Sequence, residues 1–130
     1  MFVLDTNTLI YFFKGLGNVA MRLLNTPPRD IGIPTIVIYE LEFGIAKSSA
    51  PEKRRQHLDE LLTAATVLPF DTEAARQAAR IRTDLEQAGT PIGPYDVLIA
   101  AVALSRQAVL VTRNSGEFGR VDGLQLQNWF

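Results

Sequence analysis

Oxygen-bearing side chains occur in four segments that lie far apart in this sequence of 130 residues. Three of the segments carry Asp5, Glu40 and Asp96, and the fourth carries Asn114 and Glu117. Cysteine is absent, and the one histidine lies in a charged stretch where a surface role is expected. Carboxylate and amide oxygens without thiolates or imidazoles suit Mg²⁺ or Mn²⁺ better than zinc or copper. If the fold brings these side chains together, they form a centre for metal-dependent chemistry.

Asp96 stands in the first turn of a predicted helix that Gly93 and Pro94 open. At helical spacing, the side chains that share its face are those of Ile99, Ala100 and Ala103. Asp96 therefore ends an apolar stripe that should pack inward, and a buried carboxylate without a partner is costly. It needs a cation, a metal ion or several hydrogen-bond donors.

Glu40 raises a similar question, because it follows an apolar run in the middle of a predicted helix with few polar positions. Gly44 lies one turn later on the same face, and glycine inside a helix costs about 1 kcal/mol relative to alanine. One reason for a glycine there is the close approach of another backbone or of a ligand beside Glu40.

Short apolar runs alternate with helical segments along the chain. The expected strands are residues 2–4, 31–33, 67–70, 108–112 and 124–126, and the expected helices are residues 9–14, 35–47, 51–65, 72–88 and a helix from residue 93 onward. This alternation predicts an α/β fold with a central parallel sheet of about five strands and helices on both faces. Asp5 then follows the first strand, where ligands of such sheets collect, although this residue taken alone is better explained as a helix N-cap. Asp71 is the expected N-cap of the 72–88 helix.

The composition fits a single globular domain, residues 1–130, with 47% hydrophobic and 21% charged residues. No apolar run reaches the ~20 residues of a membrane-spanning helix, and no basic leader precedes Asp5, so a cytoplasmic protein without membrane contact is expected. The net charge of −1 provides no general positive field for nucleic acid. Most cations are arginine, whose planar guanidinium matches phosphate oxygens, but a lineage preference for arginine explains the bias equally well.

The segments named above resemble, in the same order, the motifs of the PIN-domain ribonucleases, and particularly of enterobacterial-type VapC toxins. The resemblance rests on Leu4-Asp5-Thr6-Asn7, Tyr39-Glu40-Leu41 with Gly44, the stretch from Gly89 to Asp96, Val111-Thr112-Arg113-Asn114 with Glu117-Phe118, and Gly123-Leu124 with Trp129. It covers essentially the whole chain and implies a PIN-like fold.

The resemblance also implies site roles. Asp5, Glu40 and Asp96 would bind Mg²⁺ or Mn²⁺, and the fourth site residue would be Glu117 or Asn114, with Glu117 preferred. The supporting residues would be Thr6 and Thr112, together with Asn114 if Glu117 takes the fourth place. The implied reaction is metal-assisted hydrolysis of RNA phosphodiester bonds.

Several arginines are candidates for contact with the RNA backbone: Arg76, Arg80, Arg82 and Arg113. Each is equally explained as a solvated surface cation, and Arg82 has Glu86 one turn away as an ion-pair partner. The resemblance to VapC further implies tRNA as substrate, with cleavage of the initiator tRNA in its anticodon region as the specific expectation.

Partners are expected as well. The predicted first helix is apolar on every side, so it is either enclosed or covered by another chain. The resemblance implies a homodimer, a VapB-type antitoxin and a larger toxin–antitoxin complex.

Two alternative functions are a PIN-like module that binds RNA with little or no catalysis and an aspartyl-phosphate phosphatase. The phosphatase fits poorly because Asn7 stands where that chemistry needs a second acid.

Overall fold

The computed structural model describes residues 1–130, and at its centre lies a five-stranded sheet in which all neighbouring strands are parallel. The strand order is β3-β2-β1-β4-β5. The strands are β1 (Phe2–Leu4), β2 (Ile31–Pro34), β3 (Thr66–Leu68), β4 (Val109–Val111) and β5 (Gln125–Gln127). The predicted parallel sheet is confirmed, and the predicted strand bounds are close to those observed.

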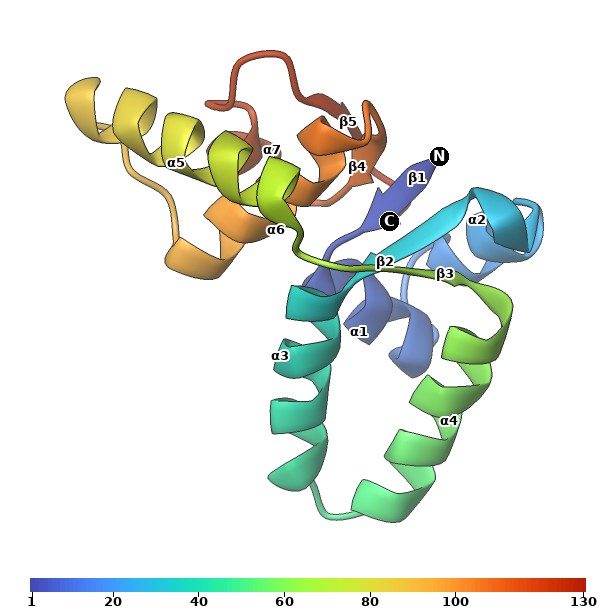
Figure 1. The fold of residues 1–130 in the computed structure, drawn as a ribbon. Helices are drawn as coiled ribbons and strands as arrows, with labels where there is room; N and C mark the ends of the chain where they lie inside the picture. Colours follow the sequence, from blue (N-terminus) through green and yellow to red (C-terminus); the bar gives the residue numbers. More distant parts are fainter.

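Helices connect the strands (Figure 1). They are α1 (Thr6–Lys14), α2 (Val19–Leu24), α3 (Thr35–Ala46), α4 (Pro51–Ala64), α5 (Thr72–Gln87), α6 (Pro94–Ser105) and α7 (Ser115–Phe118), with one 3₁₀ turn at Pro28–Asp30. The sequence predicted all of these except α2, α7 and the 3₁₀ turn. None of the helices combines the length and the apolar character that spanning a membrane requires.

Both faces of the sheet are covered, as predicted. Val3 and Leu4 are neighbours in β1, and Leu110 and Val111 are neighbours in β4; all four are 0% exposed. Successive side chains of a strand point to opposite faces, so burial of both neighbours requires packing on both sides. The helices α5 and α6 run side by side on one flank of the molecule (Figure 1).

The path of the chain reverses between β1 and β4. From β1 the chain continues through β2 to β3, and then returns through α5 and α6 to β4 on the other side of β1. Open α/β sheets bind ligands at such a switch point, beyond the carboxyl ends of the strands. Here the backbone N–H of Asp5 donates to the carbonyl of Val111 at 3.2 Å, which joins the ends of the two strands.

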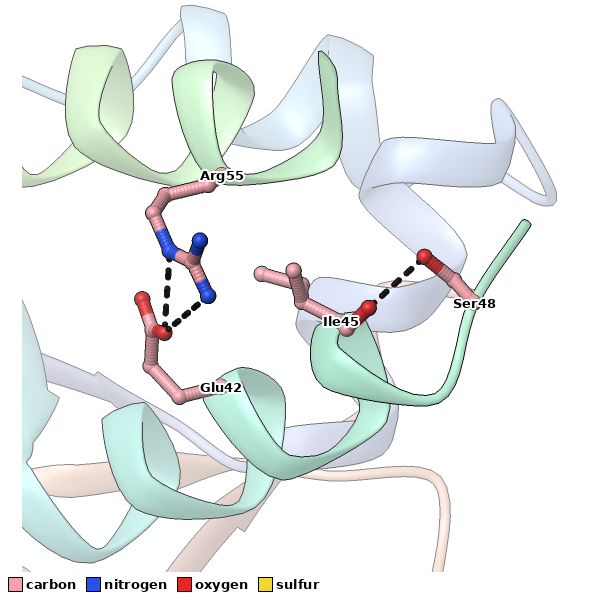
Figure 2. A network of polar contacts seen from close by, with 4 residues as sticks. All are labelled: Glu42, Ile45, Ser48 and Arg55. Atoms are coloured by element: carbon pink, nitrogen blue, oxygen red, sulfur yellow. Dashed lines mark hydrogen bonds and ion pairs between the residues drawn. The ribbon is translucent and has the colours of Figure 1, made fainter. Parts of the chain in front are cut away.

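A helical hairpin, α3 and α4, extends away from the sheet (Figure 1). Leu58 of α4 is 0% exposed and anchors the hairpin to the core. Arg55 of α4 donates from Nε and Nη2 to one carboxylate oxygen of Glu42 on α3, at 3.2 and 3.1 Å (Figure 2). The Ser48 hydroxyl donates to the carbonyl of Ile45 at 2.8 Å, where α3 ends. Because the Arg55 and Glu42 side chains are exposed, this ion pair contributes at most about 1 kcal/mol.

Asp71 caps α5, as the sequence predicted. Its Oδ1 accepts a hydrogen bond from the N–H of Ala74 at 2.9 Å. We expect Asp71→Ala to lower the free energy of unfolding by about 1 kcal/mol, because that N–H loses its partner. Asp71→Asn should leave stability nearly unchanged, since asparagine caps helices as well as aspartate does. Urea denaturation of both variants measures the difference, and equal stabilities would contradict the capping role.

Candidate active site

Asp5 follows β1 directly and lies at the switch point between β1 and β4. It is only 5% exposed, and its Oδ1 accepts a hydrogen bond from the N–H of Thr8 at 2.9 Å, which caps α1. The Thr8 hydroxyl donates in turn to the carbonyl of Val111 at 3.1 Å. The cap therefore fixes Asp5 against the end of β4, and its Oδ2 accepts no hydrogen bond from the chain.

Glu40 comes from α3, which follows β2. Its Oε1 accepts a hydrogen bond from the Thr6 hydroxyl at 2.8 Å, so α1 and α3 are joined beside Asp5. Gly44 and Glu40 line the same cavity between α1, α3 and α4. A Cβ atom on Gly44 would meet nothing within 4 Å. No backbone therefore approaches Gly44, and the glycine borders open space next to Glu40.

Asp96 begins the predicted apolar stripe of α6, and the stripe is confirmed: Ile99, Ala100 and Ala103 are at most 1% exposed. Asp96 itself is half-buried and pairs with no cation. Burial raises its pKa from 3.8 to about 7, helped by a hydrogen bond to Glu117 and by the negative charges of Glu117, Glu40 and Asp5. In the folded chain this carboxyl therefore holds its proton more tightly than an exposed aspartate does.

Glu117 lies in α7, the short helix that the sequence did not predict. The side-chain oxygen of Asn114 accepts a hydrogen bond from the N–H of Glu117 at 3.3 Å, and its Nδ2 donates to Glu117 Oε2 at 3.1 Å. Thr112 is 2% exposed, and its hydroxyl accepts from the N–H of Asn114 at 3.0 Å. These contacts hold the Glu117 side chain with Asn114 as its hydrogen-bond partner, and the charge of Glu117 acts on Asp96.

The charges of three acids from three other segments, Asp5, Glu40 and Glu117, thus all act on Asp96 at the carboxyl edge of the sheet. No three His, Cys, Asp or Glu side chains are positioned to hold one ion together as the structure stands. The donor set nevertheless fits Mg²⁺ or Mn²⁺, because it consists only of hard oxygen ligands. A cation would also relieve the crowding of negative charge that raises the pKa of Asp96. The Thr6 hydroxyl engages only Oε1 of Glu40, so the other oxygen stays available, and an ion bound by Asp96 would compete with the proton that its raised pKa favours.

Comparison with known proteins places this arrangement in a family. The PIN domain family model matches residues 2–124. The chain is 38% identical to the tRNA(fMet)-specific endonuclease VapC of Salmonella typhimurium, over 98% of this chain and 97% of the relative. The chain belongs to the VapC proteins of the PIN-domain family. It is also 34% identical to ribonuclease VapC2 of Rickettsia felis, over 99% of this chain and 98% of the relative.

Solved structures of VapC proteins share the fold. The crystal structure of DNA-bound VapBC from Salmonella typhimurium matches with a TM-score of 0.93 and 38% identity, covering 99% of this chain and 98% of that chain. VapBC2 from Rickettsia felis, bound to a DNA fragment from its promoter, matches with a TM-score of 0.91 and 35% identity, again covering 99% and 98%. The PIN-like fold that the resemblance implied is therefore confirmed.

None of the arginines predicted to contact RNA forms an ion pair with an acid of the site in this VapC fold. Arg80 and Arg82 of α5 pair with acids one turn away, at 3.6 Å and 2.9 Å, and the Arg82 pair with Glu86 is the one that the sequence offered as an alternative. Arg76 is exposed on the same helix. The Arg113 guanidinium stacks 3.7 Å from the centre of the Phe130 ring. None of these cations pairs with a site acid, and their RNA contacts stay predictions.

A tyrosine pair beside the acids was missed by the sequence interpretation. The hydroxyls of Tyr39 and Tyr95 lie 3.3 Å apart and form a hydrogen bond, which raises the pKa of the Tyr95 hydroxyl. The contact joins α3 to α6 one residue before Glu40 and one residue before Asp96. The repeated tyrosine-acid dipeptide was the available signal, but only the packing of the two helices shows that the tyrosines meet.

Proposed function

We propose that this chain is the toxin of a toxin–antitoxin pair and a Mg²⁺-dependent endoribonuclease that hydrolyses a phosphodiester bond of tRNA. The observation that supports the proposal is that Asp5, Glu40 and Glu117 all act electrostatically on Asp96 near the β1–β4 switch point of a VapC fold. A group of oxygen ligands with excess negative charge is suited to a divalent cation.

The residues of the chain have distinct roles in this proposal. Asp5, Glu40 and Asp96 would hold Mg²⁺ or Mn²⁺, with Glu117 as the fourth acid. When bound, the ion supplies an activated water and neutralises negative charge that develops on the phosphate. Asp5 is held in place by the N–H of Thr8, and Glu40 is oriented by the Thr6 hydroxyl. No protein nucleophile is required, which agrees with the absence of cysteine.

The substrate proposal rests on the relatives. VapC proteins of Salmonella typhimurium and Shigella flexneri, 38% and 34% identical to this chain, are tRNA(fMet)-specific endonucleases. We therefore assign initiator tRNA as the substrate, cut in the anticodon region. This substrate also implies a cytoplasmic location.

The partner proposal rests on the VapBC structures and on α1. VapC chains of the same fold are seen in complexes with VapB. Four consecutive apolar residues of α1, Ile10 to Phe13, are only partly buried, although they pack against the core. We assign a VapB-type antitoxin and a second copy of this chain as partners in a larger complex, with α1 contributing to the contacts.

Incubation of the purified chain with total tRNA tests the proposal. We expect one dominant cut in initiator tRNA with Mg²⁺ or Mn²⁺ present, and at least a hundredfold slower cleavage in excess EDTA. Sequencing of RNA ends gives the cut site. A chain that binds the tRNA without cutting it would be a PIN-like RNA-binding module, and a stable phosphoryl-aspartate adduct would identify a phosphatase-type hydrolase; either result contradicts the proposal.

A further inference from the structure

A cavity of about 420 Å³ opens next to the acidic site, between α1, α3 and α4. Glu40 and Gly44 line it on the α3 side. The other charged or titratable side chains of the lining are all basic: Lys14 of α1 and Lys53, Arg54 and His57 of α4. The apolar part of the lining is buried or half-buried, whereas the four basic side chains are exposed. A negatively charged site is thus continued by a positively charged cavity.

Helix α4 presents only basic charges to this cavity. Lys53, Arg54 and His57 line it, and no acidic side chain of α4 does. The acids Glu52, Asp59 and Glu60 line a different hollow of the surface together with Arg55, and Glu60 also lies beside His57 in a further hollow.

The four basic side chains of the cavity are also free of partners. None of Lys14, Lys53, Arg54 and His57 forms an ion pair or a side-chain hydrogen bond with the chain. Arg55, the neighbour of Arg54, does not line the cavity and is bound to Glu42 (Figure 2). Of these two adjacent arginines, Arg54 has no acidic partner and can bind an anion, whereas the charge of Arg55 is already paired.

We propose that this cavity binds phosphate groups of the substrate RNA strand next to the phosphate that is cut. The inference rests on the proposed function and names residues that position its substrate. An RNA strand that approaches four carboxylates is repelled by them, and cations that share a cavity with Glu40 offset that repulsion. Phosphate is the occupant because the unpaired charges of the lining, apart from Glu40, are all positive and exposed.

The pair Arg54→Gln and Arg55→Gln tests the proposal, because both variants lose one positive charge from adjacent positions of α4. A phosphate contact contributes a salt slope of about 0.7 to 0.9, which corresponds to about a four- to fivefold change in affinity at ~0.15 M salt. We expect Arg54→Gln to raise KM for an initiator tRNA transcript about four- to fivefold with kcat unchanged, and Arg55→Gln to leave KM unchanged. Lys53→Gln combined with Arg54→Gln should raise KM about twentyfold. The slope of log affinity against log salt should fall by about 0.7 to 0.9 for each contact removed.

Direct binding of the transcript separates this inference from the proposed function. The binding is measured by fluorescence anisotropy in an Asp5→Asn background, so that it does not depend on cleavage. If the parent chain does not cut the transcript, the proposed function is wrong. The comparison of transcript binding by the Arg54→Gln and Arg55→Gln forms still tests whether the cavity binds phosphate. Equal binding by the Arg54→Gln and Arg55→Gln forms overturns the inference. So does a loss of antitoxin binding in Arg54→Gln with an unchanged KM, because the cavity would then be a protein-binding groove. Should Arg54→Gln fold poorly, Lys14→Gln on α1 provides the same test from the other wall of the cavity.

Discussion

Replacing Asp5 with asparagine is expected to lower kcat for RNA cleavage by about a thousandfold while leaving the fold intact. The loss follows because asparagine carries no negative charge to hold a divalent cation at the switch point. The fold survives because the asparagine side-chain oxygen can still accept the hydrogen bond that Asp5 takes from the N–H of Thr8 at 2.9 Å. The variant thereby separates the two roles of Asp5, the helix cap and the site acid.

Asp71→Asn is the matched control for this experiment. Asp71 caps α5 by the same type of contact, 2.9 Å from the N–H of Ala74, but it does not act on the acidic site. We expect full activity from Asp71→Asn and the parent melting temperature from both variants, measured by circular dichroism. An Asp5→Asn protein that cleaves initiator tRNA as fast as the parent would show that Asp5 is only a cap.

Two of the proposed site acids occupy positions where the sequence shows a local conflict, whereas Asp5 was proposed through the family resemblance, because a helix cap explains it alone. Asp96 ends a stripe of residues that are now seen to be buried. Glu40 interrupts an apolar helix and shares a face with Gly44. Burying a carboxylate among apolar neighbours costs free energy, so such a pattern in the sequence indicates a carboxylate with a functional partner. Asp71 was predicted as a helix cap for a different reason, its place directly before a helical run.

Other features depend on packing that no local pattern reveals. Helix α7 has only four residues, too few for a helical period, so the approach of Glu117 to Asp96 was not visible before the fold was known. The arginines of α5 and the cations of α4 are both spaced as helical neighbours in the sequence. Only the position of α1 and α3 beside α4 shows that Lys53 and Arg54 face a cavity, whereas Arg80 and Arg82 find partners on their own helix.

The second large effect is expected at Asp96, where Asp96→Asn should abolish cleavage and yet make the metal-free protein more stable. The pKa of Asp96 is raised from 3.8 to about 7 in the folded chain, chiefly by burial and then by Glu117. Between these two pH values the folded state binds a proton that the unfolded state has lost, so stability falls as pH rises from about 4 to about 7. Above pH 7 the folded protein carries the full penalty of an ionised carboxylate among other acids. Asparagine removes that penalty.

Melting temperatures across pH test this expectation. A shift of about 3 units corresponds to at most about 4 kcal/mol, and the half-exposed position of Asp96 reduces the gain expected for Asp96→Asn at pH 8 to about 1–2 kcal/mol. The gain should shrink below pH 7 and vanish near pH 4, where both states of the parent are protonated. Asp122→Asn, at an exposed aspartate before β5, should show no such trend.

Added Mg²⁺ should reverse the order of stability at pH 8. An ion that binds only the folded state stabilises it in proportion to the logarithm of its concentration above Kd, and the parent retains the ligand that the variant lacks. The melting temperature of the parent should therefore rise with Mg²⁺ by several degrees more than that of Asp96→Asn. If Mg²⁺ raises the melting temperatures of the parent and of Asp96→Asn equally, Asp96 is not part of the ion site. The negative charges around Asp96 would then have a role other than binding a cation.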